Sequence, residues 1–304
     1  MTTDHNNSEK EKKSAALSSV VAAVGLTSFK IIVGIITGSL GILAEAAHSS
    51  LDLVAAMVTY FAVRISGKPA DVEHRYGHGK VENLSALFET LLLLATCVWI
   101  IYEAIQRLFF KQVEVDANIW GFIVMATSIV IDYSRSRILY RAARKYNSQA
   151  LEADALHFST DIWSSSVVIL GLGCVWLAKT FPALRFLHSA DSIAALGVAV
   201  IVIYVSIELG IRTVQGLLDT SPKGMVDKVK VAVENVPGVV DCHNIRTRMS
   251  GPQLFIDVHI LVDGEQTLKE AHDLTESIEK AIHQIVPEAD ITIHPEPKGN
   301  LNAA

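Results

Sequence analysis

Six stretches of this 304-residue chain are apolar over the length that a helix needs to cross a lipid bilayer, roughly 20 residues. The chain is 50% hydrophobic and only 19% charged, whereas soluble proteins carry about 25% charged residues. Because lipid offers the backbone no hydrogen-bond partner, these stretches must fold as helices. The predicted spans lie near residues 15–37, 40–65, 82–109, 117–139, 150–181 and 189–214.

After the sixth span the sequence changes to that of a soluble domain. Residues 218–222 combine a helix stop with a helix start signal, and residues 253–262 alternate as a half-buried strand does. The predicted elements are a helix at 222–236, strands near 239–249 and 253–262, a helix near 267–286 and a strand near 289–294. This α-β-β-α-β order predicts an α+β sandwich with the helices on one face of the sheet.

The predicted fold class is therefore a membrane all-α six-helix bundle followed by a cytoplasmic α+β domain. The expected boundaries are a polar tail at 1–14, a transmembrane domain at 15–216 and a soluble domain at 217–304. Lys and Arg gather on one side of the predicted spans, which by the positive-inside rule places both termini in the cytoplasm. These residues are Lys10, Lys12, Lys13, Lys68, Arg75, Lys80, Arg135, Arg137, Arg141, Arg144 and Lys145.

Composition and motifs argue against several other classes of protein. A net charge of −6 without a basic, aromatic-rich patch argues against a nucleic-acid partner. The three cysteines form no CxxC pair, so neither a disulfide framework nor a thiolate metal site is indicated. The chain has no HExxH, GxSxG or Walker sequence, so neither an enzyme nor an ATP-driven pump is expected.

Two of the predicted spans contain the same pattern of ionisable residues, His-x-x-x-Asp. It joins His48 to Asp52 in the second span and His157 to Asp161 in the fifth. A spacing of four puts both side chains on one helix face, and ionisable groups in hydrocarbon are functional candidates because their burial is expensive. Two such faces turned toward each other would supply four N and O ligands, a set that suits tetrahedral Zn²⁺.

Hydrogen bonding between helices is the alternative explanation for these polar faces. Two identical pairs on two helices favour a metal site, whereas Glu45 and Asp154 lie toward helix ends, where helix packing or a vestibule wall explains them better. Other charged residues in or near the spans are expected to form ion pairs or line a pathway: Lys30, Glu89, Glu103, Asp132 and Glu208.

Two more clusters of candidate metal ligands lie outside the spans. Between the second and third spans, Asp71, His74 and His78 offer a carboxylate and two imidazoles within eight residues, although loop histidines are often merely solvated. In the soluble domain, residues two apart on a strand point to one side, as His294 and Glu296 do. The candidates there are His243, His259, His272, His294 and Glu296, with His283 and Cys242 as weaker ones.

The chain resembles the cation diffusion facilitator family, and within it the bacterial zinc and ferrous-iron efflux transporters. The resemblance covers nearly the whole chain and rests on several specific strings in the right order. They are AEAAHSSLD, DVEHRYGHGKVE, EADALHFSTD, LLDTSP, HNIRTRMSGP and ITIHPEP.

The resemblance implies a role for each cluster and a homodimer. The transport site would be His48, Asp52, His157 and Asp161, and the loop site Asp71, His74 and His78. A binuclear cytoplasmic site, shared across the homodimer, would be His243, His259, His272, His294 and Glu296. Lys80 and Asp219 match a pair that forms an interlocking salt bridge at the family's dimer contact, and the tail would be the family's metallochaperone-like domain.

His48 departs from the resemblance, because the nearest relatives carry aspartate at that position. Imidazole in place of carboxylate makes the site softer and removes one negative charge, and in the family this set goes with zinc and poorer cadmium transport. Glu296, where the family has aspartate, keeps the carboxylate one carbon further out. We therefore expect Zn²⁺ as transported and regulatory metal, with Fe²⁺, Co²⁺, Cd²⁺ or Mn²⁺ as alternatives.

The predicted function is efflux of a divalent cation in exchange for protons, by alternating access across a bacterial inner membrane. A metal-bound histidine must be neutral, so metal binding expels protons. Metal at the cytoplasmic domain is expected to regulate transport, and no organic cofactor is expected. One rival, an intramembrane metallohydrolase, would need a general base and an open coordination position. The other, a metal-binding sensor or scaffold, has little reason to place four ligands in the bilayer.

Overall fold

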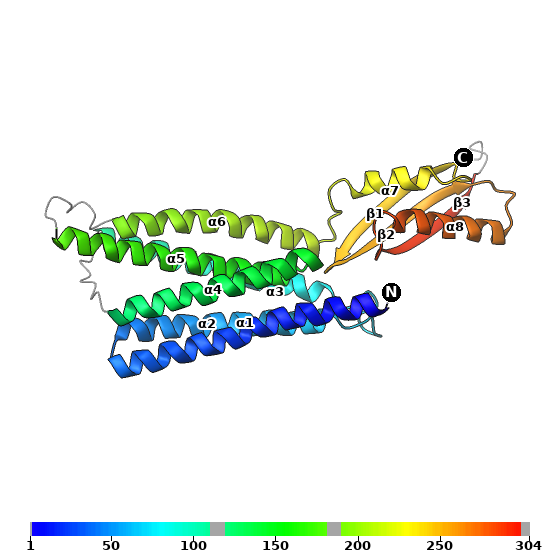
Figure 1. The fold of residues 1–304 in the computed structure, drawn as a ribbon. Helices are drawn as coiled ribbons and strands as arrows, with labels where there is room; N and C mark the ends of the chain where they lie inside the picture. The colour runs from blue at the N-terminus through cyan, green and yellow to red at the C-terminus, as the bar shows by residue number, and fades with distance from the viewer. Residues whose placement is uncertain (1, 110–118, 181–189, 299–304) are drawn as a thin grey trace. The chain divides into compact units, whose positions relative to one another are not determined.

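Six long helices precede the soluble domain in this computed structural model, which describes residues 2–109, 119–180 and 190–298 (Figure 1). The predicted span limits at 117, 181 and 189 lie outside the described residues. The helices are α1 (Thr2–Thr37), α2 (Leu40–Ser66), α3 (Lys80–Phe109), α4 (Ile119–Tyr146), α5 (Gln149–Thr180) and α6 (Ala190–Leu217).

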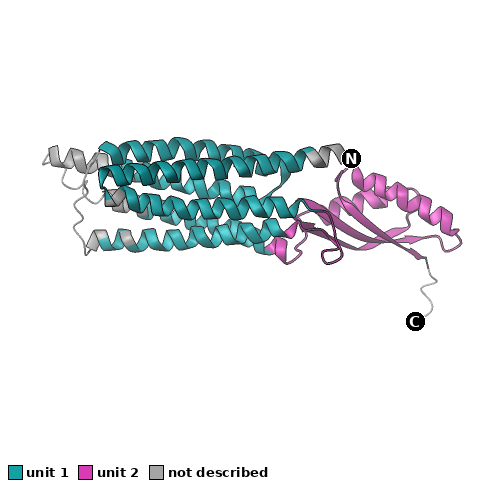
Figure 2. Cartoon of the chain, turned by 90° about the horizontal axis from the view of Figure 1, so that it is seen from below, with its two compact units in different colours: residues 1–68, 81–214 teal, residues 69–80, 215–304 magenta. Residues whose placement is uncertain are grey.

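The chain divides into two compact units, which Figure 2 shows in different colours. One unit contains residues 1–68 and 81–214, and the other contains residues 69–80 and 215–304. The loop between α2 and α3 therefore belongs to the same unit as the C-terminal domain, although in sequence it separates two helices of the bundle.

Within the described residues, four helices are long and apolar enough to cross a membrane, judged by length and composition alone. α4 and α5 are not among these four, and both carry buried polar residues: Asp132 and Arg135 in α4, Asp154 and His157 in α5. Polar groups in a membrane helix are tolerated where neighbouring helices cover them. The four spans are Asn7–Thr37, Ile42–Ser66, Lys80–Gln106 and Leu196–Leu217.

The residues of the predicted polar tail are helical, since α1 begins at Thr2 and continues to Thr37. Lys12 is buried, and its Nζ lies 2.5 Å from Glu9 Oε1 and 3.2 Å from Glu82 Oε1. Glu82, fully buried at the start of α3, also accepts hydrogen bonds from the hydroxyls of Ser66 and Ser148. A buried carboxylate needs such partners, and the charged tail supplies the cation.

The C-terminal domain is a three-stranded sheet covered on one face by two helices. Strand order is β1-β2-β3, with β1 antiparallel and β3 parallel to β2. Alternate residues of β2, among them Ile256, Val258 and Ile260, are buried against both helices, as the predicted alternation requires. The elements are α7 (Met225–Glu234), β1 (Asp241–Ser250), β2 (Gln253–Val262), α8 (Leu268–His283) and β3 (Asp290–Pro297).

Local signals mark where these elements begin and bend. Thr267 caps α8 and forms a capping box with Glu270, which satisfies backbone N–H groups of the first turn. β1 has a register shift between His243 and Arg246, where Asn244 takes a φ of 51°. Asparagine tolerates this left-handed conformation better than most residues, and such a bulge can re-aim a neighbouring side chain.

Replacing Ile278 by alanine should destabilise the C-terminal domain by about 2–5 kcal/mol, because this side chain of α8 is fully buried and its truncation leaves a cavity. Denaturant unfolding of a fragment of residues 219–304 measures the loss. Leu268→Ala, on the same helix but 89% exposed, should change the free energy of unfolding by less than about 0.5 kcal/mol. Equal losses would contradict the packing of α8 on the sheet.

Candidate metal centres

The two His-x-x-x-Asp faces meet between α2 and α5. His157 Nε2 lies 3.2 Å from Asp52 Oδ1 and 3.7 Å from Asp161 Oδ2. His48 Nε2 lies 3.9 Å from Asp52 Oδ1 and 3.8 Å from Asp161 Oδ1. Each imidazole therefore faces two carboxylates, one from its own helix and one from the other.

These separations are close to those of ligands around one metal ion. Zinc–nitrogen and zinc–oxygen bonds of about 2.0–2.1 Å place neighbouring ligand atoms of a tetrahedron about 3.3–3.4 Å apart. Ligand atoms of His48, Asp52 and Asp161 all lie within 4.8 Å of one another, and His157 contacts both carboxylates. Two carboxylates and two neutral imidazoles also carry the two negative charges that a divalent cation neutralises.

Lys30 of α1 lies beside this group of four residues. Its buried Nζ donates a hydrogen bond to Ser49 Oγ at 2.7 Å and lies 3.3 Å from Glu45 Oε2. Ser49 and Glu45 belong to the same polar stripe of α2 as His48. Glu45 is thus paired with a lysine, and its ion pair in the described residues is with Lys30 and not with one of the four candidate ligands.

A second buried network surrounds Arg135, which the sequence analysis counted among the charges on one side of the predicted spans. Arg135 lies within α4, where its guanidinium is 3.1 Å from Asp132 Oδ1 and 3.4 Å from the ring centre of Phe158. It also donates to Ser19 Oγ, which donates to Asp154 Oδ2 at 3.3 Å. The i,i+3 spacing of Asp132 and Arg135 is the signal that could have predicted this ion pair.

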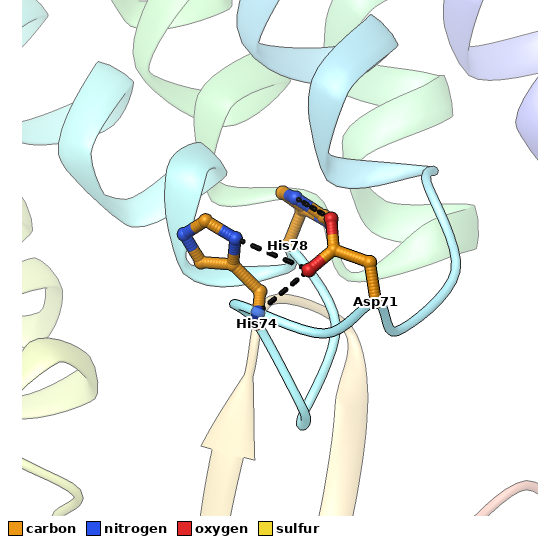
Figure 3. A group of neighbouring side chains, drawn as sticks. All are labelled: Asp71, His74 and His78. Atoms are coloured by element: carbon orange, nitrogen blue, oxygen red, sulfur yellow. Dashed lines mark hydrogen bonds and ion pairs between the residues drawn. The ribbon is translucent and has the colours of Figure 1, made fainter.

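The loop between α2 and α3 brings Asp71, His74 and His78 together (Figure 3). Asp71 Oδ1 lies 3.5 Å from His74 Nδ1, and its Oδ2 lies 3.3 Å from His78 Nε2. The backbone N–H groups of His74 and Glu73 donate to Asp71 and hold the pKa of its carboxyl below the ordinary value. Gly77, at a φ of 74°, makes the turn between the histidines. One carboxylate thus stands between two imidazoles near solvent.

Three histidines lie side by side across the sheet of the C-terminal domain. His243 in β1 is the register partner of His259 in β2, and His259 is that of His294 in β3. Opposed residues share a sheet face, with Cβ atoms about 4.5–5.5 Å apart. Val258 and Ile260, on either side of His259, are buried against the helices. The histidines therefore occupy the face that α7 and α8 leave uncovered.

Glu296 completes this cluster from β3, two residues after His294. Its carboxylate lies 2.7 Å from His259 Nδ1, 3.3 Å from His243 Nε2 and 3.8 Å from His294 Nε2. The hydrogen bond with His259 lowers the pKa of the Glu296 carboxyl, and the nearby imidazoles act in the same direction. An ionised carboxylate among three imidazoles is a ligand set for a divalent cation.

His272 does not join the cluster within one chain. It is exposed on α8, with its Nε2 3.7 Å from Glu276 Oε1, and α8 covers the opposite face of the sheet. The weaker candidates lie elsewhere as well: His283 is 3.4 Å from Glu279, and Cys242 is buried in the hydrophobic core.

Lys80 and Asp219 form an ion pair within one chain. Lys80 Nζ lies 2.9 Å from Asp219 Oδ1 and donates to the backbone carbonyl of Leu217 at 3.4 Å. The guanidinium of Arg248 lies 4.0 Å from the other oxygen of Asp219. The carboxylate of Asp219 is therefore shared by two cations from distant parts of the sequence.

A helical membrane domain with a partly buried His/Asp group, followed by a domain with a histidine-bearing sheet face, defines a protein that handles metal cations at a membrane. Comparison with known families agrees. Residues 16–218 match the cation efflux transmembrane domain, and residues 222–298 match the cytoplasmic domain of cation efflux proteins.

Individual relatives match over almost the whole chain. The cation-efflux pump FieF of Yersinia enterocolitica is 34% identical over 290 residues, which cover 94% of this chain and 92% of that protein. The protein of the same name from Salmonella arizonae is 32% identical over 288 residues, covering 93% and 92%. A solved structure of CzrB in a zinc form is 30% identical over 27% of this chain and 94% of that chain, with a TM-score of 0.25.

The chain therefore belongs to the cation diffusion facilitator family. It is a cation efflux transporter and not an enzyme, and it is an integral membrane protein with a cytoplasmic C-terminal domain. The predictions of the family, of a helical membrane domain followed by an α-β-β-α-β domain, and of non-enzymatic transport are confirmed.

Proposed function

We propose that this transporter exports Zn²⁺ in exchange for protons, with His48, Asp52, His157 and Asp161 as its transport site. The observation that carries the proposal is the meeting of two helix faces, where both imidazoles lie 3.2–3.9 Å from both carboxylates. Four protein ligands can replace the hydration shell of an ion, so the ion can pass a dry barrier without water.

Exchange for protons follows from the chemistry of the ligands. A zinc-bound imidazole must be neutral and a bound carboxylate ionised, so protons and metal compete for the same atoms. An ordinary imidazole has a pKa of about 6.5, between the pH of the cytoplasm and that of an acidified exterior. A site that loads Zn²⁺ from the cytoplasm and then turns outward meets protons that displace the metal, as alternating access requires.

Zinc is the substrate that this ligand set favours. Imidazole nitrogen suits Zn²⁺, and carboxylate oxygen completes a tetrahedral shell that needs no additional water. Mn²⁺ prefers six oxygen ligands. The alternative substrates are Fe²⁺, Co²⁺, Cd²⁺ and Mn²⁺. The nearest relatives are expected to carry a carboxylate at the position of His48. The imidazole of His48 shifts the metal preference of the site toward zinc.

The cytoplasmic domain is proposed to sense the same metal and to regulate transport as part of a homodimer. His243, His259, His294 and Glu296 lie on the sheet face that α7 and α8 leave uncovered, with their ligand atoms close together. A second copy could add ligands such as His272, and the loop group of Asp71, His74 and His78 offers a third site. Metal could draw the two cytoplasmic domains of a dimer together. If the metal binds more tightly in one conformational state of the transporter than in the other, it shifts the equilibrium of the membrane domain toward that state.

The proposed topology has both termini in the cytoplasm of a bacterial inner membrane. Six crossings return the chain to the side on which it began, and the C-terminal domain is cytoplasmic. The Lys and Arg of the predicted connections support the same orientation. The proposed division is a tail at 1–14, a membrane domain at 15–216 and a regulatory domain at 217–304.

Zinc flux into proteoliposomes should depend on a pH gradient. With Zn²⁺ outside and a trapped zinc indicator, an acidic interior should accelerate uptake, because protons release the metal there. The double variant His157→Ala with Asp161→Ala should lower uptake to that of protein-free vesicles, while His283→Ala, which alters a half-buried histidine outside the clusters, should transport normally. Flux that ignores the gradient, or that survives the double variant, would contradict the proposal.

Replacing His48 by aspartate should widen the range of metals that the protein transports. A third carboxylate makes the site harder and more negative, so uptake of Cd²⁺ relative to Zn²⁺ should rise on the order of tenfold, which corresponds to about 1.4 kcal/mol. Competition among Zn²⁺, Cd²⁺, Fe²⁺, Co²⁺ and Mn²⁺ in the same vesicles measures this. Glu45→Gln, in the same stripe of α2, is the control and should keep the wild-type order. An unchanged order for His48→Asp would show that this residue does not set selectivity.

Zn²⁺ should compact and dimerise the cytoplasmic domain. Small-angle scattering of residues 219–304 measures both the mass and the radius of gyration of the particle. With Zn²⁺ the mass should rise to that of a dimer, and the radius of gyration should be smaller than expected for that mass. The reason is that the metal neutralises the charge of the ligand group and joins ligands of two copies. The variant His259→Ala with Glu296→Ala should lose this response, whereas His283→Ala should keep it. If the wild-type fragment shows no response to Zn²⁺, the proposed regulatory role is wrong.

A further inference from the structure

A fully buried carboxylate of α3 lies behind the proposed transport site. Glu89 is 0% exposed, and its Oε2 lies 3.6 Å from His157 Nδ1. The opposite ring nitrogen of His157, Nε2, is the atom that faces Asp52 and Asp161. The imidazole is therefore held between the carboxylates of the transport site on one side and Glu89 on the other.

The rest of the Glu89 side chain is fixed in place. Its Oε1 accepts a hydrogen bond from the hydroxyl of Thr59 in α2 at 3.2 Å, and Thr59 is also fully buried. In the described part of the chain, neither Glu89 Oε2 nor His157 Nδ1 has a hydrogen-bond partner. Two buried polar atoms left unpaired are costly, so a small rotation of the imidazole that joins them is favourable.

Only one nitrogen of a neutral imidazole carries a hydrogen, and only the other can bind a metal. An acceptor beside Nδ1 keeps the hydrogen there and leaves the lone pair on Nε2. Metal-binding histidines commonly have a carboxylate in this role, and its removal typically costs about 10–100-fold in metal affinity. Glu89 has the position and the chemistry for this role.

We propose that Glu89 is a positioning residue of the transport site, which accepts the Nδ1–H of His157 and so holds Nε2 toward the metal. This inference rests on the proposed transport function. Glu89 would not coordinate the transported ion itself, because the imidazole ring lies between the Glu89 carboxylate and the four-ligand group.

Glu82 is a matched control for Glu89. Both are carboxylates of α3, seven residues apart and therefore on one side of the helix, and both are 0% exposed. Glu82 pairs with Lys12 and accepts from Ser66, so its role is to hold helices together. A variant at Glu82 shows what loss of a buried carboxylate does to the bundle without touching a transport-site histidine.

The test uses the full chain in lipid, with Asp71→Ala and His259→Ala in the background to disable the other two clusters. Zn²⁺ affinity is measured by competition with a chromophoric chelator. The nitrogen chemical shifts of ¹⁵N-labelled histidine, with His157 assigned from a His157→Gln sample, identify which ring nitrogen is protonated and which binds Zn²⁺. Melting temperatures report the stability of each variant.

Glu89→Gln should lower Zn²⁺ affinity about 10–100-fold and change the His157 nitrogen shifts, because Thr59 engages the amide oxygen and leaves an NH₂ group facing Nδ1. Glu82→Gln should leave affinity and shifts unchanged even if its melting temperature falls. The parent protein should show His157 protonated at Nδ1 and bound to zinc through Nε2. Zinc ligation through Nδ1 in the parent overturns the inference without any variant.

Wild-type affinity and shifts in Glu89→Gln would also overturn the positioning role. The proposed transport site is judged separately by Asp52→Ala in the same background, which should abolish Zn²⁺ binding. If Asp52→Ala binds Zn²⁺ normally, the transport site itself is wrong. If it loses binding while Glu89→Gln does not, only the role of Glu89 is wrong.

Discussion

The cost of placing ionisable side chains among apolar helices governs the arrangement of the membrane domain. His157 meets Asp52 and Asp161 through one ring nitrogen and faces Glu89 with the other. Lys30 reaches across from α1 to the polar stripe of α2. A charge that loses its partner in such a place is strongly destabilising, so α2 and α5 must face each other. The same constraint that folds the bundle therefore assembles a metal-sized group of ligands inside it.

In the cytoplasmic domain a different physical constraint brings the ligand group together. There the helices bury alternate residues of β2 on one face of the sheet, which leaves the other alternate residues to solvent. Because neighbouring strands are in register, His243, His259 and His294 then form a row without any cost of burial. Ligands of this kind are reachable by metal in the cytoplasm, which suits a sensor, whereas the group between α2 and α5, with Asp52 and His157 buried, suits a carrier.

Most elements could be predicted because each depends on a short-range pattern. Apolar stretches of membrane length predicted the long helices, and two-residue alternation predicted β2. The local patterns did not reveal which polar segments are packed. The residues predicted as a tail are helical from Thr2, and Lys12 among them pairs with the buried Glu82. Arg135 is buried in α4 because Asp132 and Ser19 are its partners, and a charge count over connections does not detect such pairing.

The sequence by itself determined which residues share a helix face or a strand side, since helical and strand periods follow from backbone geometry. It therefore specified both His-x-x-x-Asp faces and the common side of His294 and Glu296. Only the tertiary structure decided which faces meet. It placed Glu89 behind His157 and kept His272 away from the sheet cluster. Contacts between distant parts of a chain depend on packing of whole elements, which no local period encodes.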